Sequence, residues 1–170
     1  MALEPIHLTL PASLISYAKK VAIVRHKPGY DSHADDMQGE DWTYEFVGAL
    51  TEVAFAWWAG LKRPDMNQRE GDGGIDAVLP DGRKVQIKGT TRPDLNLLVP
   101  VRNYEDIKTC DVIVMGGVPK RMKPEEGAVD LVGWTSSVEF YAHAKLTRDR
   151  YARKMYRYDR KLLKDMKELL

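Results

Sequence analysis

The chain has 170 residues, of which 44% are hydrophobic and 30% are charged, a size and composition that suit one domain with a single core. Its 26 basic and 25 acidic residues leave a net charge of +1, which argues against a protein that coats nucleic acid through bulk charge alone. No apolar run approaches the roughly 20 residues that span a bilayer, and the single cysteine, Cys110, excludes an internal disulfide and a cysteine-based zinc site. We therefore expect a cytoplasmic protein with no membrane partner and no organic cofactor, in which any metal is bound by oxygen or histidine.

Two helices are predicted in the first third of the chain. Between residues 11 and 27, apolar residues recur at three- and four-residue steps, which is the period of one helix face. From about residue 42 the apolar positions again form a continuous stripe, and Gly60 is placed to end this second helix. The polar, turn-rich residues 29–41 between the two helices predict a loop.

Short apolar runs separated by turn residues predict a series of strands in the middle of the chain. They lie at residues 75–79, 84–89, 95–101, 111–118 and 128–134. The run at 112–115 is apolar throughout, which is typical of a central strand covered on both faces. Short helices are predicted around 103–109 and at 136–144. This order favours an α/β or α+β domain around one central mixed sheet flanked by helices.

The last 25 residues are predicted to form a long amphipathic helix, because apolar residues from 146 to 170 keep helical spacing. We therefore divide the chain into a domain at 1–145, which includes the N-terminal helix, and a basic helix at 146–170. Residues 145–167 contain ten Lys or Arg residues but only three acids, so phosphate contacts are predicted here. The residues assigned to nucleic-acid binding are Arg150, Arg153, Lys154 and Arg157.

The hairpin predicted at residues 73–91 carries the most informative pattern. If residues 80–82 form a three-residue loop that ends on a left-handed glycine, Asp76 lies directly opposite Gln86. Directly opposed side chains share one face with their Cβ atoms about 5 Å apart, so both side-chain oxygens can reach one hard cation. A two-residue loop would instead oppose Asp76 to Ile87 and destroy the site.

The residue types in this hairpin suit a magnesium centre. Asp76 and the amide oxygen of Gln86, beside the backbone carbonyl of Ile87, leave several positions for water and a phosphate oxygen, as Mg²⁺ prefers, and Mn²⁺ is a possible substitute. Because strand residues alternate between faces, Lys88 shares the face of Gln86. Lys88 is therefore placed to orient an attacking water or to neutralise the charge that develops on a phosphate.

The segments Gly74-Ile75-Asp76 and Val85-Gln86-Ile87-Lys88 resemble the core motif of the PD-(D/E)XK nuclease superfamily. The order of elements over residues 45–132 is also similar to this superfamily. Gln86 stands where an acid is usual, a variant similar to Mrr-type restriction nucleases and Holliday-resolvase-like proteins, and the neutral side chain weakens metal binding. The resemblance implies a restriction-endonuclease-like core of αβββαβ order, here with an added N-terminal helix and the long C-terminal helix.

The resemblance also implies an activity and a further site residue. It implies a Mg²⁺-dependent endonuclease that hydrolyses phosphodiester bonds in DNA, with Asp76, Gln86 and Lys88 in the catalytic site. In this superfamily the helix before the hairpin commonly donates a glutamate, which nominates Glu52 as a further metal ligand or a water-orienting base. Glu45, seven residues and so about two turns earlier, is the second choice on the same helix face.

The sequence is also compatible with two other interpretations and with an oligomer. Cleavage of both strands requires two sites, so a homodimer is expected. One alternative is a catalytically weak or inactive nucleic-acid-binding protein of the same fold, because Gln86 has lowered the charge of the site. Another is an oligomeric structural or regulatory protein whose long C-terminal helix is the functional surface.

Overall fold

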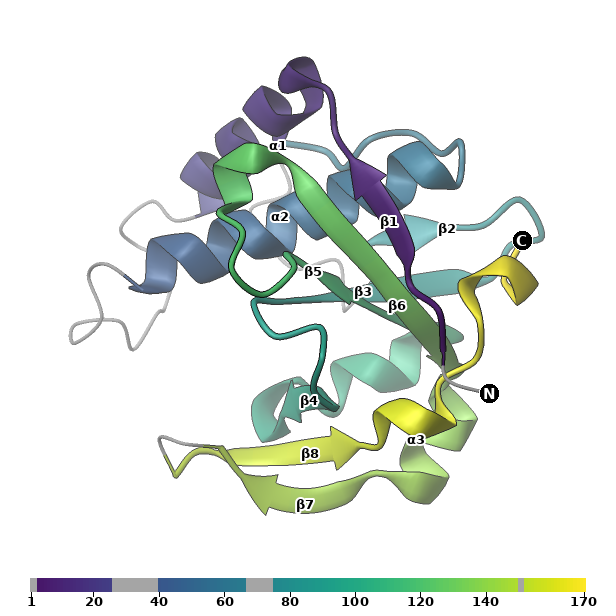
Figure 1. The fold of residues 1–170 in the computed structure, drawn as a ribbon. Coiled ribbons are helices and arrows are strands. Elements are labelled where there is room, and N and C mark those ends of the chain that lie inside the picture. The colour runs from purple at the N-terminus through teal and green to yellow at the C-terminus, as the bar shows by residue number, and fades with distance from the viewer. Residues whose placement is uncertain (1–2, 26–39, 67–74, 150–151) are drawn as a thin grey trace.

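The computed structural model of the protein describes residues 3–25, 40–66, 75–149 and 152–170. Two sheets are present in these residues (Figure 1). The helices are α1 (Ala12–Arg25), α2 (Glu40–Trp58) and α3 (Ser137–His143). The strands are β1 (Ile6–Thr9), β2 (Ala77–Val78), β3 (Lys84–Thr90), β4 (Leu97–Pro100), β5 (Val112–Gly117), β6 (Ala128–Ser136), β7 (Lys145–Arg148) and β8 (Lys154–Tyr158).

The larger sheet is mixed and has five strands in the order β1-β6-β5-β3-β2. Strand β3 pairs in parallel with β5, while the other neighbours run antiparallel. Strand β5 is buried along its whole length, which confirms the prediction of a central strand covered on both faces. The predicted α/β class with a mixed sheet and flanking helices is therefore confirmed. No helix in the described part of the chain is long and apolar enough to cross a membrane.

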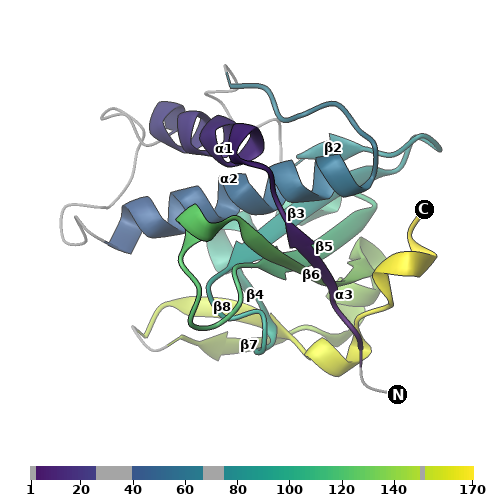
Figure 2. The same ribbon diagram turned by 45° about the horizontal axis from the view of Figure 1, so that its top comes forward.

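The two faces of this sheet are covered by different elements (Figure 2). On one face, Val85 and Ile87 of β3 pack in a core cluster with residues of α1 and α2. On the other face, Ile113 and Met115 of β5 pack with Tyr158 and other residues of the second sheet. Because neighbouring residues of a strand point to opposite faces, the alternate positions of β3 lie on the side of the second sheet.

The second sheet has the order β4-β8-β7 and corrects the prediction for the C-terminal segment. The predicted long amphipathic helix at 146–170 is wrong, since this segment forms β7, β8 and two short 3₁₀ turns. Two observations are incompatible with a continuous helix here: Ala152 has a φ of 62°, and the Asp149 carboxylate accepts a hydrogen bond from the backbone N–H of Arg153. Strand β4 pairs with β8 rather than with β3, so the strands do not form one sheet as predicted.

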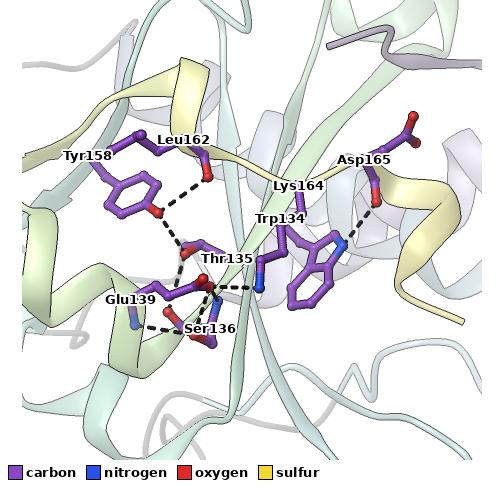
Figure 3. A network of polar contacts seen from close by, with 8 residues as sticks. All are labelled: Trp134, Thr135, Ser136, Glu139, Tyr158, Leu162, Lys164 and Asp165. Carbon is purple, nitrogen blue, oxygen red and sulfur yellow. Dashed lines mark hydrogen bonds and ion pairs between the residues drawn. The ribbon is translucent and has the colours of Figure 1, made fainter. Parts of the chain in front are cut away.

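The last residues of the chain are attached to the edge of β6 beyond the end of β1 (Figure 3). Trp134 and Lys164 exchange backbone hydrogen bonds of 3.1 and 2.7 Å, and the Trp134 indole donates to the Asp165 carbonyl at 3.0 Å. The Lys164 ammonium lies 2.9 Å from the carboxylate of Glu139 and 4.7 Å from the centre of the Trp134 ring. Residues after β8 thus contribute to both core clusters: Leu163 to one, Met166 and Leu169 to the other.

Candidate functional site

The β2–β3 hairpin has the register that its turn chemistry predicts. Ala77 pairs with Val85, and the three-residue loop ends on Gly82, whose φ is +89°. Continued by one residue, this register sets Asp76 across from Gln86. The prediction of a three-residue loop is therefore confirmed.

The Asp76 carboxylate is fixed by the backbone of β3. Its Oδ2 accepts a hydrogen bond of 2.6 Å from the backbone N–H of Ile87, and the Asp76 N–H donates to the carbonyl of Val85 at 2.8 Å. The N–H and the C=O of one strand residue point toward the same neighbour. The carbonyl of Ile87 therefore faces the side on which Asp76 lies, as the predicted ligand set requires.

Gln86 is buried, with only 6% of its surface exposed. Its Oε1 atom is inaccessible and accepts no hydrogen bond from any residue that the structure describes. An amide oxygen buried in this way loses the hydrogen bonds of water without replacement, which destabilises the folded state. A bound cation would satisfy this oxygen.

Lys88 follows two residues later on the same face and is only partly exposed. Burial lowers the pKa of its ammonium, and the negative charges of Asp76 and Asp106 act in the opposite direction. The side chain is thus a poorly hydrated cation among carboxylates, where its charge acts strongly on any nearby anion.

Glu52 lies on α2, which packs closely against β3 on the face of Val85 and Ile87, and its charge acts against burial to raise the pKa of Lys88. A Cβ atom at Gly89 would be 2.9 Å from both the Gly48 Cα and the Thr51 Oγ1, so only glycine permits this approach. Glu52, the next residue of the helix, is buried. Its two carboxylate oxygens accept hydrogen bonds from the Arg25 guanidinium at 2.7 and 2.8 Å.

Arg25 was not identified from the sequence as a residue of this region. Burial acts to lower the pKa of its guanidinium, but the hydrogen bonds and charge of Glu52 outweigh this, and the charges of Asp76 and Glu45 also raise the pKa. Arg25 therefore lies within electrostatic reach of these three carboxylates. Nothing in its local sequence distinguishes it from the other basic residues of α1, since its partner is 27 residues away.

The available ligands form an oxygen set of low charge. In the described ranges, no three His, Cys, Asp or Glu side chains gather as a metal cluster. Asp76 supplies one carboxylate, Gln86 and Ile87 supply neutral oxygens, and Glu52 is engaged by Arg25. Mg²⁺ is commonly bound by one or two carboxylates together with waters and substrate phosphates, so these residues fit a hard divalent cation. Gly74, part of the motif quoted above, lies outside the described residues.

The residues predicted to contact phosphates lie on a hairpin and not on a helix. Lys154 and Arg157 are exposed on β8, whereas the Arg153 guanidinium is paired with the Asp149 carboxylate at 2.7 Å. Arg150 lies outside the described residues.

No protein-family model, no curated protein and no solved structure matches this chain.

Proposed function

We propose that this protein is a Mg²⁺-dependent nuclease of the PD-(D/E)XK type that hydrolyses phosphodiester bonds in DNA. One observation carries the proposal. The buried Oε1 of Gln86 has no hydrogen-bond donor among the described residues, and Gln86 lies across from a carboxylate and two residues from a partly buried lysine. A divalent cation held at this point gives each of these groups a function.

The residues divide the work as follows. Asp76, Gln86 and the carbonyl of Ile87 would hold the cation, which when bound supplies Lewis-acid activation of water and of the phosphate. The Ile87 N–H fixes the Asp76 carboxylate in place, at 2.6 Å. Lys88 neutralises the charge that develops on the phosphate, and its poor hydration strengthens this effect.

The order of elements supports the proposal in part. Helix α2 precedes the β2–β3 hairpin, and β3 lies beside the buried strand β5, as in the predicted core. The structure departs from the predicted core in two ways. Strand β4 belongs to the second sheet and not to the central sheet, and short 3₁₀ turns replace the helix predicted between β4 and β5. A homodimer belongs to the proposal, since cleavage of both DNA strands needs two sites.

A plasmid-nicking assay tests the proposal. Supercoiled plasmid is incubated with wild type, Asp76→Ala and Lys88→Ala, in Mg²⁺, in Mn²⁺ and in EDTA. We expect nicking only with a divalent cation and a loss of about 100-fold or more in each variant. Asp94→Ala and Lys84→Ala, which change exposed residues, are the matched controls and should keep wild-type rates. Cleavage that survives both site substitutions would overturn the proposal.

The second candidate is a DNA-binding protein of the same fold without catalytic activity. It is favoured by the Arg25–Glu52 pair, which occupies the carboxylate that a nuclease of this type would use. Salt-sensitive DNA binding without nicking in Mg²⁺ or Mn²⁺ would establish it. The interpretation as an oligomer that acts through a long C-terminal helix loses its structural basis, because that segment forms strands.

A further inference from the structure

The hairpin of β7 and β8 concentrates positive charge in a chain that is nearly neutral. Residues 145–158 contain six Lys or Arg residues and one acid, while the net charge of the whole chain is +1. Figures 1 and 2 show this hairpin on the side of the molecule away from α1 and α2. Strand β7 is an edge strand, so one side of the hairpin has no neighbouring strand in its sheet.

The register of the hairpin places like charges directly opposite each other. Lys145 pairs with Arg157, and Arg148 pairs with Lys154. Like charges in directly opposed positions destabilise an antiparallel pair. The two pairs are three positions apart along each strand, so they project from opposite faces of the hairpin. Each face of the ribbon thus carries one pair of cations.

These four cations are not compensated within the described part of the protein. All four side chains are exposed, and none has an ion pair with a described carboxylate. Among the described residues, the Arg148 guanidinium donates to the Ala152 carbonyl, at 2.8 Å. In contrast, the neighbouring Arg153 is neutralised by Asp149. An arrangement that is unfavourable in isolation becomes favourable when an anion lies against each face.

Double-stranded DNA supplies two such anionic surfaces at a suitable separation. The major groove of B-DNA is about 12 Å wide, admits a two-stranded ribbon and has a phosphate backbone on each wall. The major groove of A-form RNA is too narrow and deep for such an element. A ribbon with cations on both faces therefore matches B-form DNA better than duplex RNA or a single strand.

We propose that the β7–β8 hairpin enters the major groove of double-stranded DNA. Lys145 and Arg157 contact the phosphates of one wall, and Arg148 and Lys154 contact those of the other. The second sheet covers the face of the central sheet that carries Gln86 and Lys88, so the hairpin and the candidate site lie on the same side of that sheet. The identification of this hairpin as the substrate-binding element rests on the proposed nuclease function, whereas the binding of duplex DNA does not.

Binding is measured by fluorescence anisotropy in EDTA, where no cation-dependent cleavage occurs. The full-length protein is titrated with a DNA duplex, with one of its single strands and with an RNA duplex of the same sequence, at several salt concentrations. The variants are Lys145→Ala/Arg157→Ala and Arg148→Ala/Lys154→Ala. The control is Lys19→Ala/Lys20→Ala, which removes the same charge from exposed positions of α1 on the opposite face.

We expect the wild type to bind duplex DNA most tightly. Each hairpin variant should bind roughly 10- to 30-fold more weakly at 0.15 M salt, and the slope of log K against log salt should fall by about 2, while the control keeps the wild-type slope. Asp149→Asn removes the carboxylate that pairs with Arg153, so this variant should bind duplex DNA more tightly than wild type. The hairpin variants should melt no lower than wild type, because each loses a like-charge contact.

Two results would overturn the inference. One is wild-type affinity and salt slope in both hairpin variants, and the other is equal or tighter binding of single strands or duplex RNA. Since cleavage plays no part in this assay, an inactive protein can still satisfy it. An active nuclease whose hairpin variants bind normally would reject the hairpin alone and leave the proposed function standing.

Discussion

Both carboxylate oxygens of Glu52 accept hydrogen bonds from the Arg25 guanidinium, which joins the end of α1 to the middle of α2. The Glu52 side chain is 9% exposed and that of Arg25 is 23% exposed. Asp76 and Glu45 also act electrostatically on Arg25. The positive charge of Arg25 therefore acts on all three carboxylates, and the cation proposed at Asp76 would compete with it.

Substitution of Arg25 by methionine should destabilise the protein strongly. Arg25→Met leaves the buried Glu52 charge without its partner, at a cost of about 3 kcal/mol in the free energy of unfolding. Arg25→Met/Glu52→Leu removes both charges and should recover most of this loss. Urea denaturation measures each value. Arg92→Ala, which breaks the exposed pair with Asp94, is the control and should cost less than about 1 kcal/mol; an Arg25→Met protein no less stable than this control would contradict the interpretation.

Lys88→Met should raise the stability of the fold and abolish the proposed nuclease activity. Methionine keeps the length of the side chain but removes an ammonium that is poorly hydrated in the folded state, so the melting temperature should rise. For a chain of this size, each kcal/mol gained corresponds to roughly 2–4 °C. DNA nicking should be lost at the same time. Lys84→Met, on the exposed end of the same strand, should change neither property, and a lower melting temperature in Lys88→Met would contradict the prediction.

The single cysteine should be unreactive in the folded protein. Burial raises the pKa of the Cys110 thiol to about 11 from an ordinary value of 9.0, although the nearby Lys88 ammonium opposes this. At pH 8 the thiolate population is then about 100-fold smaller than in the unfolded chain, and labelling by a thiol reagent should be slower by at least that factor. Equal labelling rates with and without denaturant would show that the thiol is accessible.

The raised pKa of Cys110 also makes the free energy of unfolding depend on pH. Between pH 9 and 11 the folded chain keeps the Cys110 proton while the unfolded chain releases it, so the free energy of unfolding falls as pH rises through this window. The contribution is fully present below pH 9. Cys110→Ala should flatten this part of the profile, and an unchanged slope in that variant would assign the dependence to other groups.

Gly117, at the end of β5, is a position at which no side chain fits. A Cβ atom there would lie 1.8 Å from the carbonyl oxygen of Thr90 on the paired strand β3. Gly117→Ala should therefore cost more than about 4 kcal/mol and yield little folded protein. Gly48→Ala is the matched control, because nothing lies within 4 Å of its added Cβ; inside helix α2, alanine should stabilise by about 0.5–1 kcal/mol. Circular dichroism melting compares the two, and a stable Gly117→Ala protein would contradict the close packing of β3 and β5.

Turn residues and the spacing of apolar residues are sufficient to predict the β2–β3 hairpin and the helices α1 and α2. The left-handed Gly82 sets the loop length, and the loop length sets the register that brings Asp76 across from Gln86. The helical period of the apolar residues likewise predicts α1 and α2 to within a few residues. These features depend on neighbours in sequence, so they can be derived without the fold.

The C-terminal segment was predicted wrongly because its pattern is ambiguous. Met155 and Tyr158 are three residues apart and fit one helix face, yet they are also buried from a five-residue strand rich in aromatic residues. This strand pairs with β4, which lies more than fifty residues earlier in the sequence. Two further features are not predicted because they depend on partners that are distant in sequence. They are the Arg25–Glu52 pair and strand β1, which has only four residues and pairs with β6.

Calorimetric titration with Mn²⁺ tests most directly whether Asp76 and Gln86 form a cation site. Wild type, Asp76→Asn, Gln86→Leu and the exposed control Asp94→Asn are titrated without DNA. We predict one Mn²⁺ per chain in wild type and control, no detectable binding in Asp76→Asn, and clearly weaker binding in Gln86→Leu, which removes the buried oxygen. Equal Mn²⁺ affinity in all four proteins, or no binding by the wild type, would contradict the assignment of this site.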